Sequence, residues 1–179
     1  FTKSRSTELD DYFRQPKFKR AYVAYYLPLY AAKIALILQR CANEGLLDSK
    51  KIEKEGLRML DLGAGPLSGS IGAMLAFSNV DTILAFDKHD APMRAGLEFI
   101  AQLQINDAKK VRIRRGNILD RNLLGQVSIK PNLIVIANVL NEITKRNTDD
   151  QALAQIVSRY VSLLSEDGRI LIVEPATRI

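Results

Sequence analysis

Cysteine and histidine are almost absent from this sequence of 179 residues, which has one of each and no tryptophan. A single cysteine excludes an internal disulfide, and one cysteine with one histidine cannot build a thiolate or histidine metal cluster. We therefore expect no metal site. No secretory signal with a basic start, an apolar middle and a small-residue cleavage site is recognisable. We expect a reducing, cytoplasmic-type compartment, with the mitochondrial matrix as the alternative.

Long apolar runs are absent as well. A membrane-spanning helix needs about 20 consecutive apolar residues, and the richest stretch, 21–38, is interrupted by Pro28 and Lys33. We therefore expect packed helices there and no membrane partner. The composition is that of a globular protein, with 47% hydrophobic and 26% charged residues. This length predicts one full domain with its own core.

Positive charge is in excess, with a formal net charge of +6, and it gathers in two places. The clusters are Arg14, Lys17, Lys19 and Arg20 near the start, and Lys109, Lys110, Arg112, Arg114 and Arg115 in the middle of the chain. Two basic patches suit a polyanionic partner such as RNA. The alternative is a solvated surface that keeps the protein soluble, and charge alone does not decide between the two.

The first part of the chain has a helical pattern. Between residues 7 and 44, apolar residues recur at steps of three and four, which predicts a helix with a wide apolar arc. Pro28 is expected to kink this helix or divide it in two. Its tyrosines fit a buried stripe better than a platform for stacked bases; they are Tyr22, Tyr25, Tyr26 and Tyr30. We treat 1–55 as an N-terminal helical extension and 56–179 as the main domain.

Beyond the extension, short apolar runs alternate with helical segments. The predicted strands are residues 57–62, 82–86, 111–115, 133–137 and 169–173, and the predicted helices are 66–78, 91–105 and 149–164. This alternation, with nearly continuous apolar strands, predicts an α/β fold with a doubly wound, mainly parallel sheet. In the third strand Arg112 and Arg114 share one face, which a strand buried on both faces would not tolerate. It should lie at an edge, as the strand order 3-2-1-4-5 requires.

The loop after the first strand carries the strongest motif. Residues 60–66 read Leu-Asp-Leu-Gly-Ala-Gly-Pro, and Gly63 and Gly65 allow a sharp turn that brings the backbone close to a ligand. Ligands of such sheets bind beyond the carboxyl ends of the strands, where the strand order reverses. The third glycine, Gly69, comes one residue too late for a dinucleotide turn, and Pro66 follows the second. Since Asp61 suits a ligand with an ammonium group, S-adenosylmethionine is favoured over NAD.

Polar residues at three further strand ends predict the rest of this site. Asp87 ends the second strand about 20 residues after the turn, the spacing of an acidic residue that binds ribose hydroxyls. The third and fourth strands are followed by segments with amide side chains. Each segment alone could be an ordinary turn or helix cap, but all of them at successive strand ends form the pattern of a cofactor site. The predicted cofactor-binding residues are Asp61, Gly63, Ala64, Gly65, Pro66, Asp87, Lys88, Gly116, Asn117, Ile118 and Asn138.

Together these residues resemble the class I, Rossmann-like S-adenosylmethionine-dependent methyltransferases, and specifically the methyltransferase-like family associated with the small ribosomal subunit of bacteria and mitochondria. The resemblance covers 21–177 and rests on the tyrosine-rich segment 21–28, the turn 60–66, Asn-Val-Leu-Asn-Glu at 138–142 and Val-Glu-Pro at 173–175. It implies adenosylmethionine as cofactor and ribosomal RNA of the small subunit as methyl acceptor. The family's C-terminal cysteine cluster and strands six and seven are missing, so we expect parts of the protein to lie outside this sequence.

The methyl acceptor is less well defined by the residues. Enzymes that methylate base amines place an Asn/Asp-Pro-Pro-aromatic loop after the fourth strand, and residues 138–141 read Asn-Val-Leu-Asn. Cys41 is expected in the core and not as a nucleophile. Asn141 and Glu142 are the catalytic candidates, as orienting amide and base, although helix capping would explain them equally well. The predicted function is an RNA methyltransferase. The alternatives are a small-molecule methyltransferase and a ribosome-binding factor that keeps this fold without strong catalysis.

Overall fold

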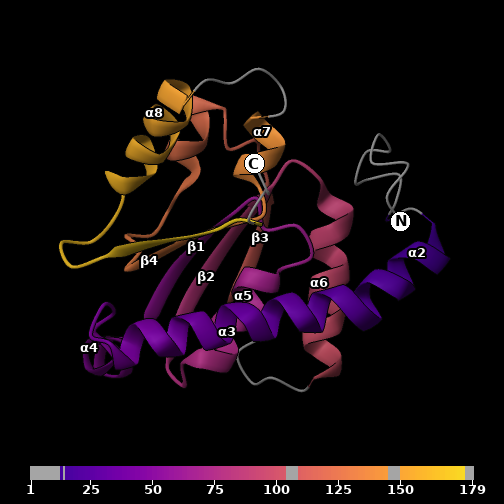
Figure 1. Cartoon of the computed structure of the whole chain (residues 1–179), viewed down its shortest axis with the longest axis horizontal. Helices are drawn as coiled ribbons and strands as arrows, with labels where there is room; N and C mark the ends of the chain where they lie inside the picture. Colours follow the sequence, from indigo (N-terminus) through magenta and orange to yellow (C-terminus); the bar gives the residue numbers. More distant parts are fainter. Residues whose placement is uncertain (1–12, 14, 104–108, 145–149, 176–179) are drawn as a thin grey trace.

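The computed structural model of the chain describes residues 13, 15–103, 109–144 and 150–175. Within them, five parallel strands form one sheet in the order β3-β2-β1-β4-β5 (Figure 1). The strands are β1 (Leu57–Leu62), β2 (Val80–Asp87), β3 (Val111–Arg115), β4 (Leu133–Ala137) and β5 (Arg169–Val173). The predicted doubly wound order is confirmed, and only β2 is longer than expected.

The burial of each strand follows its place in the sheet. The central strands β1 and β4 are buried along almost their whole length. The sequence of β4 is continuously apolar, and that of β1 is apolar apart from Arg58 and Asp61. In β3, Val111 is buried while Arg112 and Arg114 are exposed. This arrangement confirms the predicted edge position of β3. The opposite edge is β5, where Ile172 remains 42% exposed.

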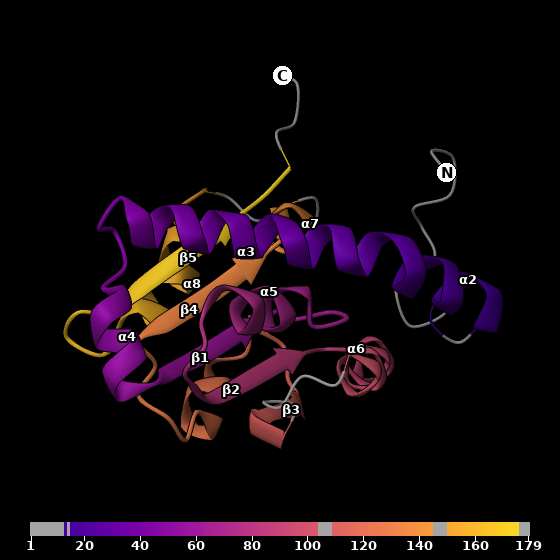
Figure 2. The ribbon, with the colours of Figure 1, turned by 90° about the horizontal axis from the view of Figure 1, so that it is seen from below.

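Helices cover both faces of the sheet (Figures 1 and 2). One face carries α3 (Leu27–Asn43), α4 (Ser49–Glu55), α5 (Ser68–Ala76) and α6 (Asp90–Gln102), and the other carries the 3-10 helix η3 (Arg121–Gln126), α7 (Leu140–Thr144) and α8 (Asp150–Val161). Two apolar clusters fill these layers. The cluster on the first face joins Leu27 and Ile34 of α3 to Leu57 of β1. The N-terminal extension therefore shares the core of the main domain, and the division between 55 and 56 stays a prediction.

The N-terminal helix is continuous from Pro16 to Asn43, through α2 (Pro16–Ala21), the π-helical turn η1 (Tyr22–Tyr26) and α3. Of the two alternatives expected for Pro28, the division of the helix in two is wrong. The π turn lies directly before the proline, and the amide of Leu27 donates to the carbonyl of Tyr22. This wider turn explains how the helix accommodates a residue that has no amide proton and would crowd the preceding turn.

The N-terminal helix differs from expectation in two further ways. By length and composition alone, this helix of 28 residues is long and apolar enough to cross a membrane. No such helix was expected from the sequence. In this structure 28% of the most apolar stretch of the helix is buried, and the buried side chains, among them Leu27, Ile34 and Leu38, belong to the core cluster on the first face of the sheet. The tyrosines are not a buried stripe, because Tyr25 is 65% exposed. Tyr26 is half-buried and stacks on Tyr30 at 6.2 Å between ring centroids.

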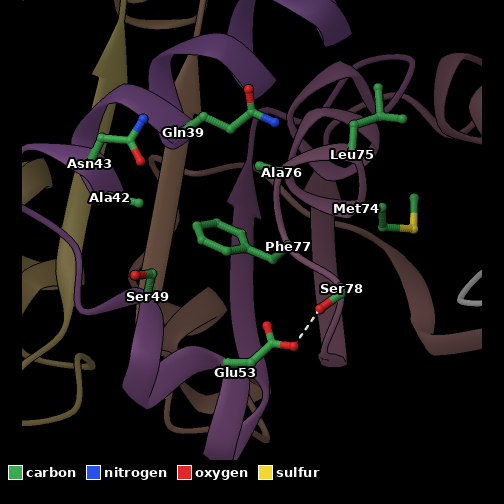
Figure 3. A pocket seen from close by; sticks show the side chains of 10 residues that line it. All are labelled: Gln39, Ala42, Asn43, Ser49, Glu53, Met74, Leu75, Ala76, Phe77 and Ser78. Atoms are coloured by element: carbon green, nitrogen blue, oxygen red, sulfur yellow. Dashed lines mark hydrogen bonds between the residues drawn. The ribbon is translucent and has the colours of Figure 1, made fainter.

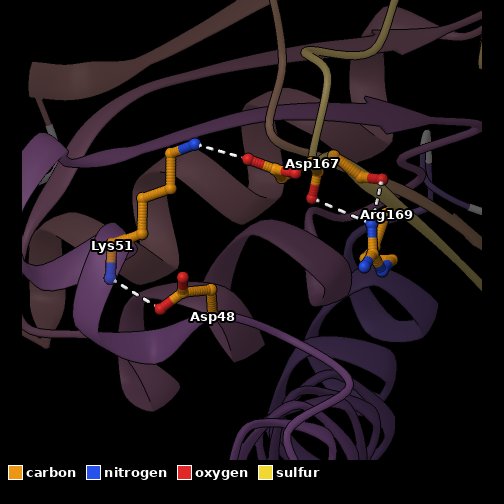
Figure 4. Close-up of polar contacts among 5 residues, drawn as sticks. Asp48, Lys51, Asp167 and Arg169 are labelled. Atoms are coloured by element: carbon orange, nitrogen blue, oxygen red, sulfur yellow. Dashed lines mark hydrogen bonds and ion pairs between the residues drawn. The ribbon is translucent and has the colours of Figure 1, made fainter.

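Polar contacts at the amino ends of the strands fix α4 to the loop before β5 (Figure 4). The Asp48 carboxylate accepts the amide of Lys51 at 2.9 Å and so caps α4. The Lys51 ammonium pairs with Asp167 at 2.7 Å. The pair raises the pKa of Lys51 and lowers that of Asp167, because each charge stabilises the other. Both side chains are exposed, so their contribution to stability is small.

Candidate functional site

The turn between β1 and α5 forms the centre of the site, at the carboxyl ends of the strands. Gly63 and Gly65 both adopt left-handed backbone conformations, with φ of 67° and 49°. At Gly63 an added Cβ would lie 2.2 Å from Cγ2 of Val139, so this glycine makes room for the loop after β4. At Gly65 an added Cβ would meet no atom within 4 Å. Gly65 as a whole is buried, but the side on which a Cβ would project is open, so a ligand could approach the turn from that side.

Asp87, at the end of β2, holds this turn in place. Its Oδ2 accepts the amide of Gly65 at 2.9 Å, and its Oδ1 accepts the amide of His89 at 2.8 Å. The carboxyl group is 7% exposed. Each carboxylate oxygen can accept more than one hydrogen bond, so acceptor capacity remains for ligand hydroxyls. The structure thus brings the predicted ribose-binding residue directly to the glycine turn.

Asp61 lies beneath the turn and does not face an open surface. It is 1% exposed, and its Oδ2 accepts both the amide of Ser70 at 2.8 Å and the hydroxyl of Ser70 at 2.6 Å. Burial raises the pKa of Asp61 to about 6; the hydrogen bonds from Ser70 lower it, and the charge of Asp87 raises it further. Asp61 anchors the start of α5, and its charge acts on the turn from below. Ser70 was not singled out from the sequence.

The pKa of Asp61 predicts a specific dependence of stability on pH. The folded-state pKa of about 6 lies above the ordinary value of 3.8, so the native state binds more protons than the unfolded state between these values. The contribution of Asp61 is fully present below pH 4 and is lost as the pH rises through about 6, on the order of 3 kcal/mol in the free energy of unfolding.

Urea unfolding from pH 4 to 8 tests this pH dependence. We expect Asp61→Asn to lack the decline of stability with rising pH that Asp61 causes in the wild type, because asparagine does not titrate. The difference in unfolding free energy between the two chains should then change by about 2 kcal/mol between pH 4 and 7, because part of the total is already lost at pH 4. A difference that is constant over this range would show that Asp61 does not titrate there.

The segment after β3 is partly built into the core. The amide of Gly116 donates to the Asp87 carbonyl at 2.9 Å, and an added Cβ at Gly116 would meet Leu123 at 2.2 Å. Asn117 is exposed, and its side-chain oxygen accepts the amide of Leu119 at 3.0 Å. Ile118 was predicted to flank a ligand but is 5% exposed and packs in the core on the α8 side. Of this segment, only Asn117 presents its side chain at the surface.

The loop after β4 closes on the glycine turn. Asn138 adopts a left-handed conformation with φ of 58°, and its amide donates to the carbonyl of Val173 at 2.8 Å. The side-chain amide of Asn141 donates to the carbonyl of Pro175 at 3.4 Å, so its observed contact ties the loop to the chain after β5. The side chain of the other catalytic candidate, Glu142, lies outside the described residues.

The remaining predicted residues surround the turn or lie away from it. Ala64 and Pro66 are buried within the turn, and the carbonyl of the half-buried Lys88 accepts a hydrogen bond from Arg115 at 3.0 Å. Cys41 packs against the core from α3, as expected. Among the described residues, no group of three or more His, Cys, Asp or Glu side chains is placed to hold a metal ion.

A cavity of about 660 Å³ lies at the opposite end of the sheet, away from the turn (Figure 3). It is lined by the last turn of α3, by α4, by the end of α5 and by the segment that joins α5 to β2. The Ser78 hydroxyl donates to Glu53 at 2.6 Å on its wall. Since α4 and this segment precede the amino ends of β1 and β2, the cavity does not belong to the candidate site.

No protein-family model and no curated protein matches the sequence. Solved structures resemble the chain in fold. A protein of Methanococcus maripaludis assigned as an S-adenosylmethionine-dependent methyltransferase superimposes with a TM-score of 0.59 at 18% identity, covering 96% of this chain and 67% of that protein. The mitomycin 7-O-methyltransferase MmcR gives 0.61 at 13% identity, over 98% of this chain and 45% of MmcR.

A third structure is the plantazolicin methyltransferase BamL, solved with a desmethyl-plantazolicin analogue and S-adenosylhomocysteine; its TM-score is 0.51 at 16% identity, over 91% of this chain and 53% of BamL. This chain thus spans about half the length of MmcR and of BamL. At these identities the likeness shows the fold alone. The chain has the Rossmann-like methyltransferase fold.

Proposed function

We propose that the chain binds S-adenosylmethionine and transfers its methyl group. The observation that carries this proposal is the contact between Asp87 and Gly65, the turn glycine whose added Cβ would meet no atom within 4 Å. This contact supports a role for the Asp87 carboxylate as acceptor for the ribose hydroxyls of a ligand bound beside Gly65. The methyltransferase fold supports the same cofactor.

The charges at the turn favour adenosylmethionine over a dinucleotide. Asp61 and Asp87 lie close enough for the charge of Asp87 to raise the pKa of Asp61. Two carboxylates beneath the turn attract an ammonium or sulfonium group and repel a pyrophosphate. The amide of Ser70 in the first turn of α5 already donates to Asp61, so it is not free to bind phosphate as in dinucleotide folds.

The proposed chemistry relies on positioning. Bound adenosylmethionine would supply a methyl group on a sulfonium that is already activated for in-line displacement. The residues of this chain would orient that group: Asp87 and the turn hold one side, and the loop that begins at Asn138 lies where the acceptor would approach. Restricting two reactants to a productive geometry can by itself provide a large part of the rate enhancement.

Photo-crosslinking tests the cofactor proposal without knowledge of the acceptor. We expect ultraviolet light to attach radiolabelled adenosylmethionine to the chain, and an excess of unlabelled adenosylhomocysteine to suppress the labelling. NADH at the same excess should leave it unchanged. Suppression by NADH and not by adenosylhomocysteine would reverse the assignment.

We further propose RNA, specifically small-subunit ribosomal RNA, as the methyl acceptor, in a cytoplasmic-type compartment. The basic clusters support this. Lys17 and Arg20 are exposed on α2, and Arg112 and Arg114 are exposed on β3. Lys19 is paired with Glu98 of α6 at 2.7 Å, and Arg14 lies outside the described residues. The long helix extends past the carboxyl edge of the sheet (Figure 2), so α2 can contact a large substrate that reaches the turn.

The salt dependence of RNA affinity tests the acceptor proposal. Each phosphate contact steepens the fall of affinity with salt. We expect Arg112→Gln with Arg114→Gln to reduce the slope of log affinity against log salt by about two. Lys54→Gln, on α4 at the opposite end of the sheet, should leave the slope unchanged. Weak, salt-insensitive binding would favour a small-molecule acceptor, and tight RNA binding without methyl transfer would favour a ribosome-binding factor.

A further inference from the structure

Glu174 makes an unusual set of contacts for a residue that follows the last strand of the sheet. Its Oε1 accepts the amides of Val139 at 2.8 Å and Leu140 at 2.7 Å, and its Oε2 lies 3.5 Å from the amide of Asn141. Val139 lies in the loop after β4, and Leu140 and Asn141 form the start of α7, so the carboxylate also caps this helix. One half-buried carboxylate thus binds three consecutive amides from a distant part of the chain.

The loop held by Glu174 is in direct contact with the glycine turn. Val139 occupies the space that an added Cβ at Gly63 would need, with its Cγ2 at 2.2 Å from that position. The preceding residue, Asn138, has φ of 58°, a left-handed conformation that asparagine adopts more readily than most residues with a side chain. Hydrogen bonds to a charged acceptor are strong, so those from Val139 and Leu140 to Glu174 hold the loop in place. The contacts therefore run from Glu174 through Val139 to Gly63.

We propose that Glu174 is a positioning residue for the cofactor turn. It touches neither the turn nor the proposed ligand, and it acts by fixing Val139 against Gly63. The expected effect of Glu174 on adenosylmethionine binding rests on the proposed function. The expected effect of Glu174 on the geometry of the turn does not depend on any ligand. Removal of the carboxylate should release the loop and let the turn leave the geometry that Asp87 fixes at Gly65.

The test compares two variants of Glu174 with a matched control. Glu174→Ala removes the acceptor, while Glu174→Gln keeps an amide oxygen that can accept two hydrogen bonds. The control is Asp48→Ala, which also removes a carboxylate from a backbone amide, that of Lys51 at 2.9 Å, but at the other end of the sheet. Calorimetry measures adenosylmethionine affinity. Amide resonances of isotope-labelled protein report the environments of Gly63 and Gly65 without any ligand.

We expect Glu174→Ala to raise the dissociation constant of adenosylmethionine about tenfold or more, as loss of charge-assisted hydrogen bonds implies. The amide resonances of Gly63 and Gly65 should shift in the same variant. Glu174→Gln should recover most of both effects. Asp48→Ala should lower the melting temperature but leave the affinity and both resonances unchanged.

The outcomes separate this inference from the proposed function. If Glu174→Ala leaves the Gly63 and Gly65 resonances in place, or if Asp48→Ala changes affinity as much, the positioning role is wrong. If the wild type does not bind adenosylmethionine, the proposed function fails. The resonance shifts then still decide whether Glu174 controls the turn.

Discussion

Replacement of Asp87 with alanine is expected to reduce the affinity for adenosylmethionine at least about tenfold. The change removes the acceptor for the amides of Gly65 and His89, and buried donors left without a partner cost about 1–3 kcal/mol each. It also removes the proposed partner of the ribose hydroxyls. Calorimetric titration measures the affinity, and urea unfolding measures the accompanying loss of stability.

Asp81 provides the control for this variant. It lies in the same strand, β2, near its amino end, and it is exposed. Asp81→Ala should change neither affinity nor stability appreciably. Asp87→Asn should fall between the wild type and the alanine variant, because one side-chain oxygen remains as an acceptor. Wild-type affinity in Asp87→Ala would remove Asp87 from the site.

The second large effect concerns the two glycines of the turn, which should respond differently to alanine. At Gly63 the new Cβ would collide with Val139 in a left-handed conformation, so we expect Gly63→Ala to lower the free energy of unfolding by about 2–4 kcal/mol. At Gly65 nothing lies within 4 Å of the new Cβ, so the loss should be only about 1 kcal/mol. Gly65→Ala should nevertheless abolish adenosylmethionine binding, because the methyl group occupies the space of the ligand.

Urea unfolding and calorimetry on both variants measure this contrast. The double variant Gly63→Ala with Val139→Ala should recover part of the stability that the collision costs, because Cγ1 and Cγ2 of Val139 are removed while its Cβ stays 2.9 Å from the new Cβ. The recovery is read from a double-mutant cycle. Equal stabilities of Gly63→Ala and Gly65→Ala would contradict the packing of Val139 on Gly63. Normal cofactor binding by Gly65→Ala would place the ligand elsewhere.

The positions and order of the strands could be predicted because buried strands are apolar and an exposed edge strand can carry charged residues. The central strands are mainly apolar, β4 without interruption, and the exposed arginines of β3 mark an edge. The place of the site followed from the parallel sheet, since the turn after β1 and the end of β2 must meet at the same edge. In the structure the two meet directly, because the amide of Gly65 donates a hydrogen bond to the carboxylate of Asp87.

The residues that were missed act across long sequence separations. Nothing near Glu174 shows that it binds amides of Val139 and Leu140, some 35 residues earlier. Ser70 was overlooked because its role depends on the burial of Asp61 beneath α5. The same limit explains why Ile118 was predicted to flank a ligand. In the sequence, an apolar residue after a strand could line a ligand site or pack in the core. Only the packing of α8 against this segment distinguishes them.

Isothermal titration calorimetry of the wild-type chain with S-adenosylmethionine is the most direct test of the proposed function. We predict saturable binding at a single site, competed by S-adenosylhomocysteine and not by NADH. The same titration should show no saturable heat with Gly65→Ala, whose stability is almost unchanged. Absence of binding by the folded wild-type chain, or binding of NADH in place of adenosylmethionine, would contradict the proposal.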